Sequence, residues 1–174
     1  ISYTIPESVI NIGDYAFSYC TNLTNIEMYN NVTSIGEWAF YNCEYLENIT
    51  ISNNLKNFGE CAFRNCKKLT SIVIPYSVTT IANSAFYNCR DLTDVYYLGT
   101  KEQWGKITVG SGADELINAN IHFLGDEYDI QIGNITADKT ARKISADFQN
   151  ASGAAKTFDA ICAVYDERGA LITY

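Results

Sequence analysis

The sequence is poor in histidine, methionine and proline. Its 174 residues include one His, one Met and two Pro. A single histidine with no paired nucleophile excludes most Ser/His/Asp and Cys/His catalytic arrangements. The sequence also has no Gly-x-Gly-x-x-Gly or P-loop pattern, so it offers no recognisable phosphate-binding loop.

Basic residues are fewer than acidic ones. The chain has 12 Lys and Arg against 20 Asp and Glu, a formal net charge of −8. An acidic surface repels phosphate backbones and anionic lipids, so we expect neither nucleic acid nor an anionic membrane as a partner. The acidic excess is divided evenly between residues 1–98 and 99–174, which indicates a solvated surface and not a charged tail.

Long apolar runs and targeting segments are missing as well. No stretch approaches the 18 or so apolar residues that would indicate a membrane span, and no secretory signal pattern is present. The chain begins at Ile1, without a start methionine and in the middle of a repeat. We therefore expect it to be a piece of a longer protein.

What the sequence does contain is an internal repeat of 23 residues. The landmark Ala-Phe-x-x-Cys occurs four times, starting at Ala16, Ala39, Ala62 and Ala85. Other columns keep the same step: Leu23, Leu46, Leu69 and Leu92; Ile26, Ile49, Ile72 and Val95; Met28, Ile51, Ile74 and Tyr97; Val9, Val32, Leu55 and Val78; Ile12, Ile35, Phe58 and Ile81; Gly13, Gly36, Gly59 and Ala82. Four cycles without an insertion indicate a repeat architecture.

Each repeat predicts a short strand followed by turns. Leu-x-x-Ile-x-Ile places the last two apolar residues on one strand face. Glycine at the Ile-Gly step predicts a turn with positive φ, and Glu/Asp-x-Ala-Phe predicts a short helical or 3₁₀ turn. One repeat cannot bury its apolar residues alone, so stacked copies with parallel strands about 4.8 Å apart are expected.

The repeat resembles the BspA-like leucine-rich repeat of bacterial cell-surface proteins, over about residues 1–123. The pattern begins at Ile5-Pro6-Glu7-Ser8-Val9 and continues through the landmark columns, and it starts again at Ile74-Pro75-Tyr76-Ser77-Val78. The resemblance implies a leucine-rich-repeat solenoid of parallel β-strands with short helical or 3₁₀ turns. It also implies an extracellular, cell-surface or secreted protein that is not an enzyme and attaches to host matrix proteins or to other cells.

The C-terminal part of the chain departs from the repeat. Residues 97–123 resemble the closing unit of such arrays, with Trp104 as a lid and Ile121–Phe123 as a last strand, which gives a first domain over 1–124. Period-two alternation then predicts strands around 128–135, 144–148 and 158–165, and Asp166–Gly169 as a hairpin turn. Residues 125–174 therefore resemble part of an immunoglobulin-like or fibronectin type III-like β-sandwich.

The sequence offers little chemistry. Four cysteines share the repeated column and are interpreted as buried free thiols, whereas Cys61 is expected to be partly exposed and Cys162 to be a core thiol. His122 is expected to face solvent. No metal or cofactor is predicted, and a Ca²⁺ site at Asp126, Glu127 and Asp129 stays an open alternative. The acidic pairs that could suit glycoside hydrolysis are interpreted as solvated charge: Glu44 with Glu47, Asp91 with Asp94, and Asp114 with Glu115.

A protein-binding surface is the function that the pattern favours. Leucine-rich repeats bind through the face lined by their strands. The outward positions of that face are predicted at Asn25, Glu27 and Tyr29; Asn48, Thr50 and Ser52; Ser71, Val73 and Pro75; Asp94, Tyr96 and Leu98. A second aromatic group, for which covering of neighbouring repeats is the alternative role, consists of Tyr15, Tyr19, Trp38, Tyr41, Tyr45 and Tyr87. The alternative function is a structural spacer that presents another domain of a larger surface protein.

Overall fold

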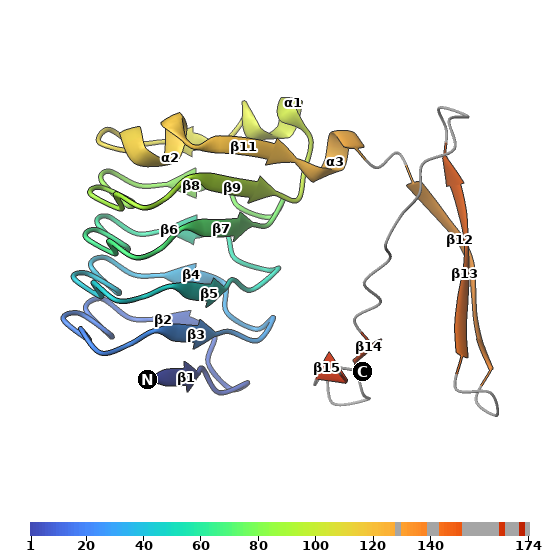
Figure 1. The fold of residues 1–174 in the computed structure, drawn as a ribbon, viewed down its shortest axis with the longest axis horizontal. Coiled ribbons are helices and arrows are strands. Elements are labelled where there is room, and N and C mark those ends of the chain that lie inside the picture. The colour runs from blue at the N-terminus through green and yellow to red at the C-terminus, as the bar shows by residue number, and fades with distance from the viewer. Residues whose placement is uncertain (128–129, 139–142, 151–163, 166–170, 173–174) are drawn as a thin grey trace. The chain divides into compact units, whose positions relative to one another are not determined.

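The computed structural model shows the repeats stacked as a parallel-strand solenoid (Figure 1). The chain divides into two compact units, Ile1–Tyr128 and Asp129–Tyr174. The structure describes residues 1–127, 130–138, 143–150, 164–165 and 171–172.

Each of the first five coils contributes one strand to each of two layers, and the last coil adds one strand to the first layer. The first layer consists of β1 (Ser2–Thr4), β3 (Asn25–Glu27), β5 (Asn48–Thr50), β7 (Ser71–Ile74), β9 (Asp94–Tyr97) and β11 (Asn120–Phe123). It forms two three-stranded sheets, β1-β3-β5 and β7-β9-β11. The second layer is one sheet in the order β2-β4-β6-β8-β10, made of Asn11–Ile12, Ser34–Ile35, Asn57–Phe58, Thr80–Ile81 and Thr108–Val109. All these pairs are parallel.

The repeated columns form the core, as their apolar character predicts. In the second to fourth copies, the Ala, Phe, Cys and Leu side chains of the landmark columns are buried. The phenylalanines form a continuous stack, in which the ring centroids of Phe17 and Phe40 are 5.1 Å apart, those of Phe40 and Phe63 4.9 Å, and those of Phe63 and Phe86 5.3 Å. Because each ring is covered by the next repeat, the stability of one copy depends on its neighbours.

The segment around the Ala-Phe landmark, where a short helical or 3₁₀ turn is expected, forms turns with i→i+3 hydrogen bonds and no continuous helix. It is a series of overlapping turns, in which the Tyr41 N–H donates to the Trp38 carbonyl at 3.1 Å and the Cys43 N–H to the Phe40 carbonyl at 3.2 Å. Two residues of each copy adopt positive φ, and a left-handed residue stops a right-handed helix from continuing. These residues are Tyr15 and Tyr19, Trp38 and Asn42, Cys61 and Asn65, and Ser84 and Asn88.

The glycine column serves close packing between repeats, and the predicted positive φ at the Ile-Gly step is wrong. Among the described glycines only Gly112 has positive φ. A Cβ placed on Gly59 would lie 2.4 Å from the carbonyl carbon of Gly36, and one on Gly36 would lie 2.4 Å from Asp14 Oδ1. These glycines therefore let the backbones of successive coils approach one another.

The buried cysteines are hydrogen-bonded thiols. The Sγ atoms of Cys43, Cys66 and Cys89 donate to the Phe carbonyls of the preceding repeats at 3.1, 3.3 and 3.1 Å. Burial raises the pKa of the Cys43 and Cys89 thiols to about 12 and that of Cys66 well above its usual value. Cys20, in the first copy, is exposed, so the predicted burial of the column is wrong for this residue.

Cys61 is buried, so its predicted partial exposure is wrong. Its side chain retains 2% of its accessible surface. The Arg64 side chain, three residues further along, brings Nη1 to 3.9 Å from the Cys61 sulfur. Cys162 lies outside the described residues.

In the last coil, side chains make some of the contacts that the backbone of a following repeat makes in the earlier coils. Helices α1 (Lys101–Trp104), α2 (Asp114–Asn118) and α3 (Leu124–Glu127) accompany β11. The Trp104 ring packs against Tyr97 at 5.1 Å and Phe123 at 6.4 Å between centroids. In the first three copies, the backbone N–H at the position equivalent to Asn88 donates to a carbonyl oxygen of the next repeat. The backbone N–H of Asn88 itself donates to Glu115 Oε1 at 2.6 Å. The Glu115 carboxylate thus takes the place of the missing carbonyl.

The described residues of the second unit form two antiparallel strand pairs. β12 (Ile130–Asp138) pairs with β13 (Lys143–Asn150), and β14 (Val164–Tyr165) pairs with β15 (Leu171–Ile172). Most of the strand predicted over 158–165 and the turn predicted at 166–169 lie outside the described residues. The immunoglobulin-like or fibronectin-like character of 125–174, and the domain division at 124, stay predictions.

Replacing Gly59 with Ala tests the close packing of coils. We expect Gly59→Ala to lower the free energy of unfolding by about 1–3 kcal/mol, because the new methyl group overlaps the Gly36 backbone. Gly13→Ala is the matched control, since a Cβ there meets nothing within 4 Å, and it should leave stability unchanged or raise it by up to about 1 kcal/mol. Urea denaturation measures both. Equal stability of the two variants would show that the column accepts a methyl group, as it does at Ala82.

The thiol environments predict selective alkylation. At pH 8 a pKa of about 12 leaves Cys43 and Cys89 with roughly a thousandfold less thiolate than an ordinary cysteine. Iodoacetamide should therefore modify Cys20 in the folded protein and spare Cys43, Cys66 and Cys89, while urea-unfolded protein reacts at all four. Peptide mass mapping measures the extent of modification at each site. Labelling of Cys66 as rapid as that of Cys20 in the folded state would contradict the buried thiol column.

Candidate functional site

The first strand layer presents two rows of outward side chains. The strands pair in register, and side chains alternate along each strand, so equivalent outward positions line up along the solenoid. One row is Ser2, Asn25, Asn48, Ser71, Asp94 and Asn120; the other is Thr4, Glu27, Thr50, Val73, Tyr96 and His122. We call these twelve residues the strand face; they lie on β1, β3, β5, β7, β9 and β11, which are labelled in Figure 1.

The strand face differs from its sequence prediction where the strands end. Ser52 has no exposed surface, and Pro75 is also buried. β5 ends at Thr50 and β7 at Ile74, so the alternation no longer holds at these positions. The Ser52 hydroxyl accepts a hydrogen bond from the Asn54 N–H at 3.2 Å, which makes it part of a turn. Tyr29 and Leu98, in the same column, are half-buried.

The strand face predicted from the sequence did not include the strands at its two ends. β1 adds Ser2 and Thr4, and β11 adds Asn120 and His122. The alternation of the closing strand already indicated that His122 faces outward, and the structure leaves 39% of its side chain exposed. The register that brings His122 beside Tyr96 is set by an insertion after the fourth repeat, which the 23-residue step does not predict.

The N-terminal half of the strand face is a polar ladder. Asn25 Nδ2 donates to Ser2 Oγ at 2.8 Å, and Asn48 Nδ2 donates to Asn25 Oδ1 at 2.9 Å. In the other row the Thr4 hydroxyl donates to Glu27 Oε2 at 3.2 Å. These polar groups bond to their own neighbours, so the ladder fixes their positions across three strands.

The C-terminal half combines apolar, aromatic and charged groups. The His122 ring stacks on Tyr96 with centroids 4.7 Å apart and an interplanar angle of 14°. His122 Nε2 lies 2.9 Å from Asp94 Oδ1, and Val73 beside Tyr96 is 42% exposed. Hydrogen bonds from His122 and then from Thr93 lower the pKa of the Asp94 carboxyl. Clustered aromatic, apolar and charged groups of this kind form the contact centres of protein interfaces.

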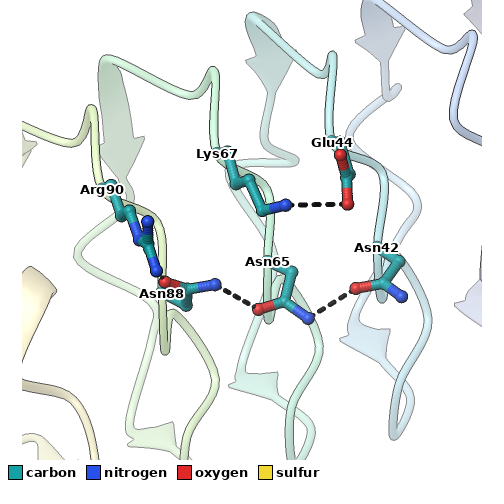
Figure 2. Close-up of polar contacts among 6 residues, drawn as sticks. All are labelled: Asn42, Glu44, Asn65, Lys67, Asn88 and Arg90. Carbon is teal, nitrogen blue, oxygen red and sulfur yellow. Dashed lines mark hydrogen bonds and ion pairs between the residues drawn. The ribbon is translucent and has the colours of Figure 1, made fainter.

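Polar ladders also connect the turns of successive coils (Figure 2). Arg90 Nε donates to Asn88 Oδ1 at 2.6 Å, Asn88 Nδ2 to Asn65 Oδ1 at 2.6 Å, and Asn65 Nδ2 to Asn42 Oδ1 at 2.5 Å. The three asparagines are left-handed residues, a conformation that asparagine tolerates better than most. This chain of amide hydrogen bonds therefore links the turns of successive coils, and asparagine also suits the left-handed backbone at each of the three positions.

The acidic pairs singled out in the sequence mostly have structural partners. Glu44 forms an ion pair with Lys67 at 2.8 Å (Figure 2). Asp91 pairs with Lys68 at 3.0 Å. Among the residues that the structure describes, no group of three or more His, Cys, Asp or Glu side chains could hold a metal ion. Asp129, part of the open Ca²⁺ alternative, lies outside them. Within the same part of the chain, no helix has the length and apolar character needed to cross a membrane.

The Asp94–His122 contact predicts an altered carboxyl titration. Because the folded-state pKa of Asp94 is lowered, the contact stabilises the fold above the ordinary carboxyl pKa of about 4, and this contribution is lost as the pH falls through the lowered value. His122→Phe keeps a ring beside Tyr96 and removes the donor. We expect the pKa of Asp94 to rise toward its ordinary value, as measured by NMR carboxyl titration. An unchanged pKa would assign the shift to the hydrogen bonds from Thr93 and Asn120.

Comparisons with solved structures place this solenoid among bacterial leucine-rich-repeat proteins. A leucine rich cell surface protein from Faecalibacterium prausnitzii A2-165 is 30% identical with a TM-score of 0.56, over 62% of this chain and 34% of that one. The Treponema pallidum leucine-rich-repeat protein TpLRR is 28% identical with a TM-score of 0.59, over 65% and 53%. A leucine-rich-repeat protein from Bacteroides capillosus ATCC 29799 is 34% identical with a TM-score of 0.50, over 56% and 77%.

The chain thus spans about a third of the F. prausnitzii protein and about half of TpLRR. No protein with a curated description matches it. The family model of the BspA type leucine rich repeat region matches residues 1–108 in six copies, which is more than half of the chain. With its 23-residue coils, parallel strand layers and buried Ala-Phe-x-x-Cys columns, the chain belongs to the BspA-type leucine-rich-repeat family.

Proposed function

We propose that this chain is the binding module of a bacterial cell-surface or secreted protein and that its strand face binds a protein ligand, such as a host matrix protein or a protein of another cell. The observation that carries the proposal is the Val73–Tyr96–His122 row beside Asp94, which presents the exposed Val73 side chain and the half-buried, stacked rings of Tyr96 and His122 on paired strands. Leucine-rich-repeat proteins typically mediate protein–protein interactions, and the F. prausnitzii relative is described as a cell surface protein.

The paired strands supply the rigidity that such a site needs. Positions on the strand face are fixed by parallel pairing and, in the N-terminal half, by side-chain hydrogen bonds. Pre-ordered side chains lose little conformational entropy when a ligand binds. The proposed role uses binding chemistry alone and assigns no catalytic residue.

A structural spacer is the second candidate. The stack of phenylalanine rings and the asparagine ladder both run from coil to coil, as would suit a stiff element between other domains of a surface protein. A spacer needs no ligand at the strand face, so the two functions differ in whether this face binds a protein, which can be measured.

Binding to matrix proteins tests the first candidate. The chain is passed over immobilised fibronectin, fibrinogen, collagen and a glycan panel on a biosensor. Saturable binding to one of the proteins is expected, and Glu27→Ala/Tyr96→Ala/His122→Ala should weaken it by about tenfold or more, because truncating one contact-centre residue costs about 2 kcal/mol or more.

A matched control separates a specific effect from a loss of folding. Glu7→Ala/Lys56→Ala/Thr108→Ala changes three exposed residues outside the strand face and should bind as the wild type does. Equal binding by both variants would move the site away from the strand face. Absence of binding to every immobilised protein would favour the spacer.

A further inference from the structure

The one histidine of the chain lies among the strand-face residues that carry the proposed function. These residues, Val73, Asp94, Tyr96 and His122, are called the contact centre below. His122 is the only imidazole in the sequence, and its ring stacks on Tyr96 with centroids 4.7 Å apart. Histidine is the side chain that ordinarily changes its charge between about pH 5 and 8. A histidine-dependent change of charge in this chain therefore takes place within the contact centre.

Asp94 holds the imidazole in one orientation. His122 Nε2 lies 2.9 Å from Asp94 Oδ1, and the Thr93 hydroxyl donates to Asp94 Oδ2 at 2.8 Å. The Asn120 side chain adds a further hydrogen bond to this carboxylate. Because an ionised carboxylate only accepts hydrogen bonds, Nε2 carries the proton of the neutral ring and Nδ1 is left as an acceptor. Both oxygens of Asp94 already accept from groups of the chain itself, so Asp94 is a positioning residue for His122.

The strand face has few other charges that could balance Asp94. β9 contributes Asp94 and Tyr96 as the titratable side chains of the face, β7 contributes none, and β11 contributes His122 alone. The other charged residue of the face is Glu27 on β3, toward the opposite end of the sheet layer. The helices of the last coil carry Lys101 and Glu102 on α1, Asp114 and Glu115 on α2, and Asp126 and Glu127 on α3. The balancing charge closest to Asp94 on the face is thus a protonated His122.

Protonation of His122 changes what it costs to cover the contact centre. Hydrogen bonds from His122 and then from Thr93 lower the pKa of Asp94, so its carboxylate stays ionised between pH 5 and 8. With a neutral imidazole, a partner that covers the contact centre removes an unbalanced negative charge from water, which is costly. An imidazolium 2.9 Å away offsets part of that cost, and its Nδ1 gains a proton that it can donate to the partner.

We propose that the strand face binds its protein ligand more tightly at mildly acidic pH, that His122 is the residue that senses the pH, and that the part of the ligand covering the contact centre is uncharged or acidic. This inference rests on the proposed function and adds its regulation and the charge of its partner. A basic partner segment suits the site less well, because Asp94 already accepts hydrogen bonds within the chain and an imidazolium repels a second cation.

The first measurement needs no ligand. The single histidine gives one imidazole Cε1–H resonance in the NMR spectrum of the full chain. This resonance should move between pH 8 and pH 5 while the backbone spectrum stays that of the folded chain, and the Tyr96 ring resonances should move with it because the two rings stack. An imidazole resonance that stays fixed over this range would show that His122 keeps its charge and would overturn the proposal.

The second measurement compares affinity at two pH values. Fibronectin, fibrinogen and collagen are immobilised on a biosensor, and the full chain is titrated at pH 5.5 and 7.5. We expect the wild type to bind one of them about fivefold or more tightly at pH 5.5. His122→Gln keeps a side-chain N–H for Asp94 and has no charge at either pH, so the ratio of its two affinities should fall to about one. Asp94→Asn removes the charge that protonation balances, so its ratio should be about one or reversed.

A matched control and a folding check accompany these variants. Glu60→Gln removes an exposed carboxylate outside the strand face and should keep the wild-type ratio. Thermal unfolding at both pH values checks that every variant is folded. Titratable groups of the immobilised protein act equally on all variants, so the comparison of ratios isolates His122.

The outcomes separate this inference from the function on which it rests. Equal wild-type affinity at both pH values, weaker wild-type binding at pH 5.5, or the same ratio in the wild type and His122→Gln would each overturn the pH dependence and leave the proposed function standing. Absence of binding to all three proteins at both pH values would overturn the proposed function, and the pH dependence with it.

Discussion

The structure depends on the stacking of backbone on backbone at a constant 23-residue step. The amides of Phe17, Phe40 and Phe63 each donate to the carbonyl of the alanine in the next copy, and all three distances are 2.7 Å. An inserted residue would shift the following donors away from their acceptors unless a loop absorbed it, as in the last coil, where the longer step still ends in paired strands. The glycine column reinforces this constraint, because it brings the coils so close that a Cβ at Gly59 would overlap Gly36. The uniform repeat length is therefore a requirement of backbone geometry.

This constraint divides the positions of each copy into two kinds. Positions that face the next coil repeat the same residue type, because the same contact recurs at each step. Phenylalanine stacks on phenylalanine, and each buried thiol donates to a Phe carbonyl. Outward positions have no such contact and differ between copies, as the row from Glu27 through Thr50 and Val73 to Tyr96 illustrates. The fold therefore leaves the chemistry of the surface free to suit a ligand.

Sequence periodicity predicts the first kind of position well and the second only in part. The buried columns and the parallel strands follow directly from apolar residues at a fixed step. The left-handed turns do not, because five of the eight described non-glycine residues with positive φ are Tyr, Trp, Cys or Ser, which seldom signal that conformation. Ser52 and Cys61 were assigned to the surface by simple alternation or by column context. Ser52 is buried because its strand ends before it, and Cys61 is buried next to Arg64, an arginine that this column contains in one copy only.

The strand face and the turns differ in how the fold relates to their side chains. On the strand face, extended backbone is the normal conformation for Tyr96 and His122, and their stacking follows from parallel pairing. At the turns, Tyr15, Tyr19 and Trp38 occupy a left-handed conformation that the asparagines of the same segments adopt more readily. Side chains at the turns therefore have to suit a demanding backbone, whereas the strands accept almost any outward residue. This freedom makes the strand face the more regular platform for a binding site.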